Sequence, residues 1–163
     1  MAWERSFASP AGDVDDFAAF QCWSGQAGTP WIEEVENYVR VSVLSAALWT
    51  VAFRDEAGKL SAVSAFDPVP IEVPLCNPVE NPGWKLQVVA VALDHQTQGR
   101  CREVYRETFA AMREADPQRL LVTANVHRQH AVSLKAAASA GLTLLMPGDE
   151  FHLVLGEVPR PSG

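Results

Sequence analysis

Residues 91–102 read VALDHQTQGRCR and join an apolar run to a charged, periodic stretch. The run that precedes the turn, WKLQVVAVAL (84–93), is typical of a strand buried on both faces. From Gly99 onward the apolar residues recur at helical spacing. A strand that turns at a glycine into a helix presents backbone N–H groups at the positive end of the helix dipole. The junction therefore predicts either an anion site, to which Arg100 and Arg102 add charge, or a plain turn with solvated arginines.

The rest of the chain predicts a single mixed α/β domain over residues 1–158, with a disordered Pro-rich tail at 159–163. Five prolines between Asp67 and Pro82 favour an extended crossing or an edge segment there. The expected helices cover 13–23, 30–48, 99–115 and 130–141. The expected strands are a hairpin over 49–66 and the segments 84–93, 119–126, 142–146 and 151–157.

Composition and charge narrow the class of protein. The chain has 163 residues, 48% of them hydrophobic, and has no apolar stretch long enough to span a bilayer. Its first 20 residues carry four acidic side chains and no apolar run, so we expect no secretory signal. Its three cysteines are scattered, which favours a cytoplasmic protein and argues against a disulfide framework or a metal site. Twelve acidic and five basic residues precede Asp94, and eight of each follow from there, so the whole net charge of -7 lies in the first half. Such a balance argues against a nucleic-acid partner.

Two motifs carry a resemblance to a known family. Gln96-x-x-Gly99-x-Cys101, on the strand-to-helix junction, resembles the [Q/R]-x-x-G-x-[G/A] acetyl-CoA loop of the GNAT N-acetyltransferases. HRQHAVSLKAAASAGL (127–142) is similar to that family's second signature, H-P-x-N-x-x-S-x-x-x-A-x-x-A-G-F, and lies one helix and one strand downstream. The likeness covers residues 84–157, and the first half of the chain only in element order. It implies a GNAT-like fold with a mixed central sheet flanked by helices.

The resemblance also implies an acetyl-CoA site. Backbone groups of Val91 and Leu93 would meet the pantetheine arm, and the loop would bind the pyrophosphate. Thr97 and Cys101 replace small loop residues of the family, and Cys101 is expected to be a packed side chain rather than a nucleophile. The cofactor contacts implied in this way are Val91, Leu93, Gln96, Gln98, Gly99, Arg100, Cys101 and Arg102.

The resemblance implies an N-acetyltransferase that uses acetyl-CoA to acetylate the primary amine of a small molecule or peptide. However, this chain lacks the usual catalytic side chains at the family's catalytic positions. Asn125 falls where some members carry a glutamate, Ala137 where many carry the tyrosine that protonates the thiolate, and His130 where they carry an asparagine. Asn125 and His130 are the candidates for proton handling. The gaps keep open a second reading, an inactive acyl-CoA-binding sensor or interaction module.

The amine acceptor is expected in the acidic first half of the chain. Trp31, Glu34 and Trp84 are the candidates for its contacts, because an acidic, aromatic-edged surface suits a cationic amine. The acidic residues at the start of the helix expected over 30–48 are equally well explained as solvent-exposed side chains without a binding role. A third hypothesis is a toxin-type member that acetylates aminoacyl-tRNA, against which the net charge speaks. The oligomeric state stays open, a homodimer included.

Overall fold

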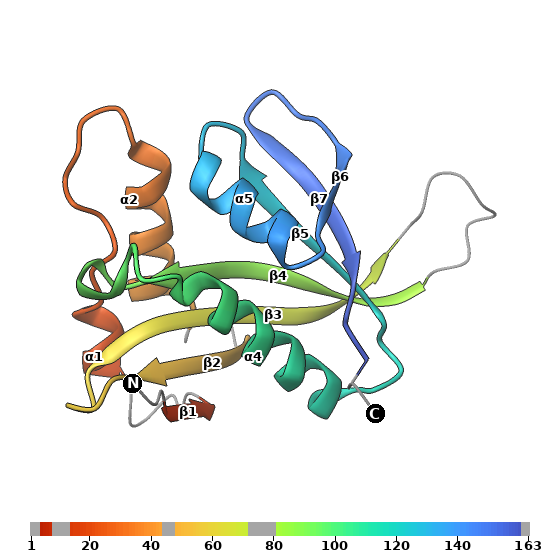
Figure 1. Ribbon diagram of the computed structural model, residues 1–163, viewed down its shortest axis with the longest axis horizontal. Helices are drawn as coiled ribbons and strands as arrows, with labels where there is room; N and C mark the ends of the chain where they lie inside the picture. The colour runs from red at the N-terminus through yellow and green to blue at the C-terminus, as the bar shows by residue number, and fades with distance from the viewer. Residues whose placement is uncertain (1–3, 8–13, 44–47, 72–80, 161–163) are drawn as a thin grey trace. The chain divides into compact units, whose positions relative to one another are not determined.

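A computed structural model of the protein describes residues 4–7, 14–43, 48–71 and 81–160 (Figure 1). Its strands follow the hydrogen-bonded order β1-β2-β3-β4-β5-β7-β6. Strands β4 and β5 pair in parallel, whereas β1–β2, β2–β3, β5–β7 and β6–β7 are antiparallel, so the sheet is mixed as expected. No helix in the described ranges is long and apolar enough to cross a membrane.

The chain divides into two compact units, and each is described by itself. Unit 1 comprises Met1–Phe66 and Val88–Tyr105, and unit 2 comprises Asp67–Gln87 and Arg106–Gly163. Three elements, β3, β4 and α4, contribute residues to both. The elements that begin in unit 1 are β1 (Glu4–Phe7), α1 (Val14–Ala18), α2 (Pro30–Asn37), the π-helix η1 (Tyr38–Ser42), β2 (Trp49–Arg54), β3 (Leu60–Ile71), the 3-10 helix η2 (Leu93–His95) and α4 (Arg100–Ala115). Those that begin in unit 2 are β4 (Asn81–Val91), β5 (Leu121–His127), α5 (Ala131–Ser139), β6 (Thr143–Met146) and β7 (Phe151–Glu157).

The core of unit 1 lies between the N-terminal helices and the strands. Phe17 at the end of α1 is fully buried, and Phe20 is 3% exposed. They pack with Val39 and Val43 and with small apolar residues of the strands, among them Ala52, Val63, Ala65, Val88 and Ala90. The hairpin expected over 49–66 is confirmed, with β2 and β3 joined by a turn at Asp55–Lys59.

The two N-terminal helices differ from the sequence prediction. The first ends at Ala18, and the second changes at Tyr38 from an α-helix to a π-helix. In that π turn the N–H of Val43 donates to the carbonyl of Tyr38, five residues back. The wider turn buries Val39 and Val43 while Val41 is 70% exposed, which explains why the apolar residues of 30–48 do not follow one α-helical stripe. Residues 44–47 lie outside the described part.

Two further corrections concern strands. No sequence pattern predicted β1, which pairs with β2 over four residues. The proline-rich segment, expected as an extended crossing or an edge segment, is in part regular strand: β3 continues to Ile71 with Pro68 and Pro70 exposed, and β4 begins at Asn81, before Pro82. Residues 72–80, which hold two of the five prolines, lie outside the described residues.

Unit 2 is built on β5, which pairs in parallel with the first half of β4 and antiparallel with β7. Figure 1 shows β7 between β5 and the edge strand β6, and α5 beside β5. The helix α5 ends at Ser139, and Gly141, just past the C-cap, has a φ of 91° that glycine adopts at little cost. The largest fully buried side chains of this unit are Trp84, Met112, Val122 and Leu142. The strands and helix predicted over 119–157 are thus confirmed to within two residues.

Candidate functional site

The junction singled out in the sequence forms a compact turn in unit 1. Strand β4 ends at Val91, the single 3-10 turn η2 follows, and α4 begins at Arg100. The four residues Gln96–Gly99 therefore connect a buried strand to the N-terminus of a 16-residue helix. The strand-turn-helix arrangement expected from the sequence is confirmed.

The backbone of this turn has an unusual conformation. Thr97 has a φ of 66° and Gly99 one of 72°. A β-branched residue is a rare occupant of this left-handed region, and such strain clusters at ligand sites. No described residue accepts a hydrogen bond from the backbone N–H of Thr97, Gln98 or Gly99. Three consecutive N–H donors at a helix N-terminus form the kind of concavity that binds an anion.

The space above Gly99 is open. A Cβ built on Gly99 would meet no atom within 4 Å, so its positive φ rather than crowding requires glycine. Arg102 is exposed beside it, and Arg100 is half-buried and contacts Glu103 at 3.4 Å. Cys101 is half-buried, and desolvation raises the pKa of its thiol, so the thiolate needed for nucleophilic attack is disfavoured.

Gln96 closes the turn onto the rest of unit 1. Its side-chain amide donates to the carbonyl of Val91 at 2.9 Å and to the carbonyl of Cys22 at 2.8 Å. The N–H of Leu93 donates to the carbonyl of Gln21 at 3.0 Å. The segment 20–23 therefore lies along the end of β4, and the Leu93 N–H is engaged there. A ligand amide could bond that N–H only by replacing Gln21.

A buried carboxylate holds this segment in place. Glu36 is 5% exposed, and its Oε2 accepts hydrogen bonds from the backbone N–H of Cys22 at 2.8 Å and of Trp23 at 2.9 Å. Its Oε1 pairs with Arg40 at 2.9 Å, and Arg40 donates in turn to the carbonyl of Phe20 at 2.7 Å. Sequence reasoning missed this role by treating the acids of α2 as one group, although Glu36 and Arg40 have the i, i+4 spacing of a helical ion pair.

The two catalytic candidates lie in unit 2. Asn125 is exposed on β5. His130 is the N-cap of α5, and its Nδ1 lies 2.9 Å from the Ser133 hydroxyl. Desolvation, and secondarily the charge of His127, lowers the pKa of His130. A neutral imidazole next to a hydroxyl can accept a proton at neutral pH.

The three acceptor candidates differ in exposure. Glu34 is exposed and Trp31 is half-buried, both in the first turns of α2. Trp84 is 2% exposed, and the guanidinium of Arg119 lies 5.6 Å from its ring centroid. Trp84 is therefore part of the core of unit 2, and its burial removes it from the candidate acceptor contacts.

Comparisons with known proteins bear on the fold. No protein-family model and no curated protein matches the sequence. Among solved structures, AtaT in the AtaTR complex with acetyl-CoA has a TM-score of 0.74 at 12% identity, covering 96% of this chain and 94% of that one. AtaT complexed with acetyl-methionyl-tRNAfMet gives 0.68 at 12% identity, with 94% of each chain covered.

Two further structures are similar over nearly the whole chain. The PaiA N-acetyltransferase of Thermoplasma acidophilum, in complex with coenzyme A, has a TM-score of 0.70 at 11% identity and 96% and 99% coverage. A putative acetyltransferase of the GNAT family from Desulfovibrio desulfuricans gives 0.69 at 16% identity, with 97% of this chain and all of that chain covered. The strand order, the strand-turn-helix junction and these structures together assign the chain the fold of the GNAT N-acetyltransferases.

Proposed function

We propose that the protein is an acetyl-CoA-dependent N-acetyltransferase that acts on a primary amine of a small molecule or peptide. One observation carries the proposal: the turn Gln96–Gly99 presents three consecutive N–H donors, with open space above Gly99, at the start of α4. The similar solved structures support it, since PaiA was solved with coenzyme A and AtaT with acetyl-CoA.

The donors of the turn fit a pyrophosphate. Backbone N–H groups from Gln98 to Arg102 would face the anion, and the exposed guanidinium of Arg102 would add a charge-assisted bond. The Val91 carbonyl accepts a hydrogen bond from Gln96 and would accept a second one from a pantetheine amide. Leu93 would contribute its N–H only after Gln21 is displaced. Acetyl-CoA, when bound, supplies an activated acetyl thioester.

The chain's own residues would orient the amine and manage its proton. Transfer requires a neutral amine, so activity should rise from roughly pH 6 to pH 9 as the acceptor deprotonates. His130, whose pKa is lowered, is available as a neutral base, and Asn125 could hold a water molecule. The exposed carboxylate of Glu34 and the ring of Trp31 suit a cationic acceptor before it loses its proton.

Thermal denaturation with acetyl-CoA tests the cofactor site. Binding to the native state raises the melting temperature by linkage, and we expect this rise in the wild type. A valine in place of Gly99 adds bulk above the turn and should abolish the rise. Gly28→Val is the matched control, because Gly28 also has a positive φ of 83° and open space around it. Both variants should lose comparable stability, and only Gly99→Val should lose the response. An unchanged wild-type melting curve at millimolar acetyl-CoA overturns the proposal.

A second candidate function is an acyl-CoA-binding module without catalysis. The specific observation is Ala137, which is 1% exposed and stands where the resemblance places a proton-donating tyrosine. Free CoA release, followed with and without amines and peptides from pH 6 to pH 9, separates the two functions. Binding of acetyl-CoA with no acceleration by any acceptor favours the module.

A third candidate is an aminoacyl-tRNA acetyltransferase, favoured by the likeness to AtaT in complex with acetyl-methionyl-tRNAfMet. The charge of -7 opposes it, since tRNA binding depends on neutralising phosphates. Charged tRNA therefore belongs among the acceptors of the same assay.

We propose that the protein is located in the cytoplasm. The free thiols of Cys22 and Cys101 fit this reducing compartment.

A further inference from the structure

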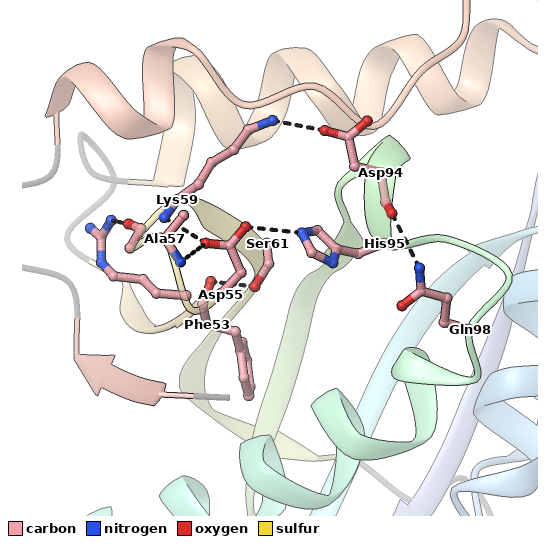
Figure 2. A network of polar contacts seen from close by, with 10 residues as sticks. Phe53, Asp55, Ala57, Lys59, Ser61, Asp94, His95 and Gln98 are labelled. Carbon is pink, nitrogen blue, oxygen red and sulfur yellow. Dashed lines mark hydrogen bonds and ion pairs between the residues drawn. The ribbon is translucent and has the colours of Figure 1, made fainter. Parts of the chain in front are cut away.

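The polar side chains that precede the turn Gln96–Gly99 are engaged with one another (Figure 2). Lys59 Nζ lies 2.8 Å from Asp94 Oδ2, and His95 Nε2 lies 3.3 Å from Asp55 Oδ2. A ligand that used these groups would first have to break their contacts. We therefore assign them to the fold of unit 1, where they join the β2–β3 turn to η2.

In unit 2, by contrast, one face of the sheet carries polar side chains at alternate positions. Burial alternates along β4, where Trp84 and Leu86 are buried and Lys85 and Gln87 are half-buried. Lys85 is the Cα partner of Thr123 on the parallel strand β5. Side chains alternate between the two faces of a sheet and paired residues share a face, so Lys85, Gln87 and Thr123 lie on the same side.

Two more polar residues belong to this face. Asp67 on β3 is half-buried, and its Oδ1 accepts a hydrogen bond from the side-chain amide of Gln87 at 2.8 Å. Asn125 is exposed and lies two positions after Thr123 on β5, where burial again alternates. The neighbouring strands β3, β4 and β5 therefore bring a carboxylate, an ammonium group and two side-chain amides to one face.

The two charges of this face, on Asp67 and Lys85, do not neutralise each other. Among the residues that the structure describes, neither forms an ion pair, and Asp67 bonds only the neutral amide of Gln87. Each side chain is nonetheless partly withdrawn from water, which costs free energy unless an opposite charge is supplied. Separate, half-buried charges of opposite sign on adjacent strands suit a small ligand that carries both charges.

We propose that this face of unit 2 binds an α-amino acid, whose carboxylate pairs with Lys85 and whose ammonium group pairs with Asp67. Neighbouring strands lie about 4.8 Å apart, so side chains from β3 and β4 reach the two ends of a ligand of this size. The amide of Asn125 has both a donor and an acceptor to offer either group. A dicarboxylate would place a like charge against Asp67, and a diamine would place one against Lys85, which selects against both.

This binding goes beyond acetyl transfer and does not depend on it. An amino acid can bind the face of unit 2 in the absence of acetyl-CoA. An amino acid is also a primary amine of a small molecule, so within the proposed function it is the class of acceptor that this face selects.

Saturation-transfer difference NMR with the common amino acids, in the absence of acetyl-CoA, identifies the strongest ligand. Isothermal calorimetry then compares that amino acid with its α-amide, which lacks the carboxylate, and with its N-acetyl derivative, which lacks the ammonium group. Losing a hydrogen bond to a charged group changes affinity about tenfold, so each derivative should bind about tenfold more weakly. These comparisons use the unmodified protein and do not depend on the folding of a variant.

Two substitutions assign the charges. Lys85→Gln should weaken the amino acid about tenfold and leave the α-amide unchanged. Asp67→Asn, which keeps an acceptor for Gln87, should weaken the amino acid about tenfold and leave the N-acetyl derivative unchanged. Lys135→Gln and Asp149→Asn are the matched controls, since they remove the same charges from exposed positions of unit 2, and neither should change the affinity.

Three outcomes overturn the amino acid site. They are the absence of any bound amino acid, a derivative that binds as tightly as the amino acid itself, and an effect of Lys85→Gln no larger than that of Lys135→Gln. The melting response to acetyl-CoA, measured on the same protein, is independent of all three. Failure of the amino acid site is thus distinguishable from failure of the proposed function.

Discussion

Removal of the Glu36 carboxylate should break the hydrogen bonds that hold residues 20–23 along the end of β4. The side chain of Glu36 is 7% exposed, and its two oxygens engage the N–H groups of Cys22 and Trp23 and the guanidinium of Arg40. In Glu36→Ala all three partners lose their acceptor. Two of them are backbone donors that cannot turn to solvent without moving the segment.

The size of the effect follows from burial. Breaking a buried ion pair by removing one partner costs about 3–5 kcal/mol. The lower end applies here, because the Arg40 side chain is 33% exposed and can recover hydration. We therefore expect Glu36→Ala to lower the free energy of unfolding by about 3 kcal/mol, and the melting temperature by about 6–12 °C for a chain of this length. Glu36→Gln keeps one acceptor oxygen and should lose about half as much.

Urea denaturation followed by circular dichroism measures these differences. Glu33→Ala is the control, since Glu33 is exposed on the same helix and should change stability by no more than about 0.5 kcal/mol. Glu36→Ala should be the least stable variant and Glu33→Ala the most stable. A loss below about 1 kcal/mol in Glu36→Ala would show that the segment is held by its apolar contacts, and would refute the role assigned to the carboxylate.

Three other predictions concern single side chains. Thr97→Asn should stabilise the protein by about 0.5–1 kcal/mol, because asparagine tolerates the positive φ better than a β-branched residue, and an unchanged denaturation midpoint would contradict the strain at Thr97. Burial raises the pKa of the Cys22 thiol to about 12 and also raises that of Cys101, so both should react slowly with a thiol reagent at pH 8, and rapid labelling of either of these two residues in the native protein would contradict this. His130 has a lowered pKa in the folded protein, so the unfolded chain binds more protons near pH 6 and stability should fall as the pH drops from 7 to 5. His130→Gln should flatten that slope, and an unchanged slope would show that other groups cause it.

Local patterns in the sequence predicted those elements whose formation depends on local residues. Alternation around the turn at Asp55–Lys59 predicted the hairpin of β2 and β3, and helical periodicity from Gly99 predicted α4. Gly99 itself marked the junction, because a positive φ restricts the choice of residue at that position whatever lies around it. These signals depend on backbone preference and on the period of burial, both of which can be read along the chain.

Contacts between distant segments were decided only by the tertiary structure. Gln96 and Cys22 are 74 positions apart, and nothing in either local sequence indicates that the amide of one meets the carbonyl of the other. The pairing of β1 with β2 and the π turn at Tyr38 likewise depend on what each segment packs against. Glu36 belongs to a run of acids that are identical in type, yet it alone of them is buried, because only its position on α2 faces the backbone of residues 22 and 23. A carboxylate is stable in such a place only when donors surround it, and the fold, not the local sequence, brings those donors together.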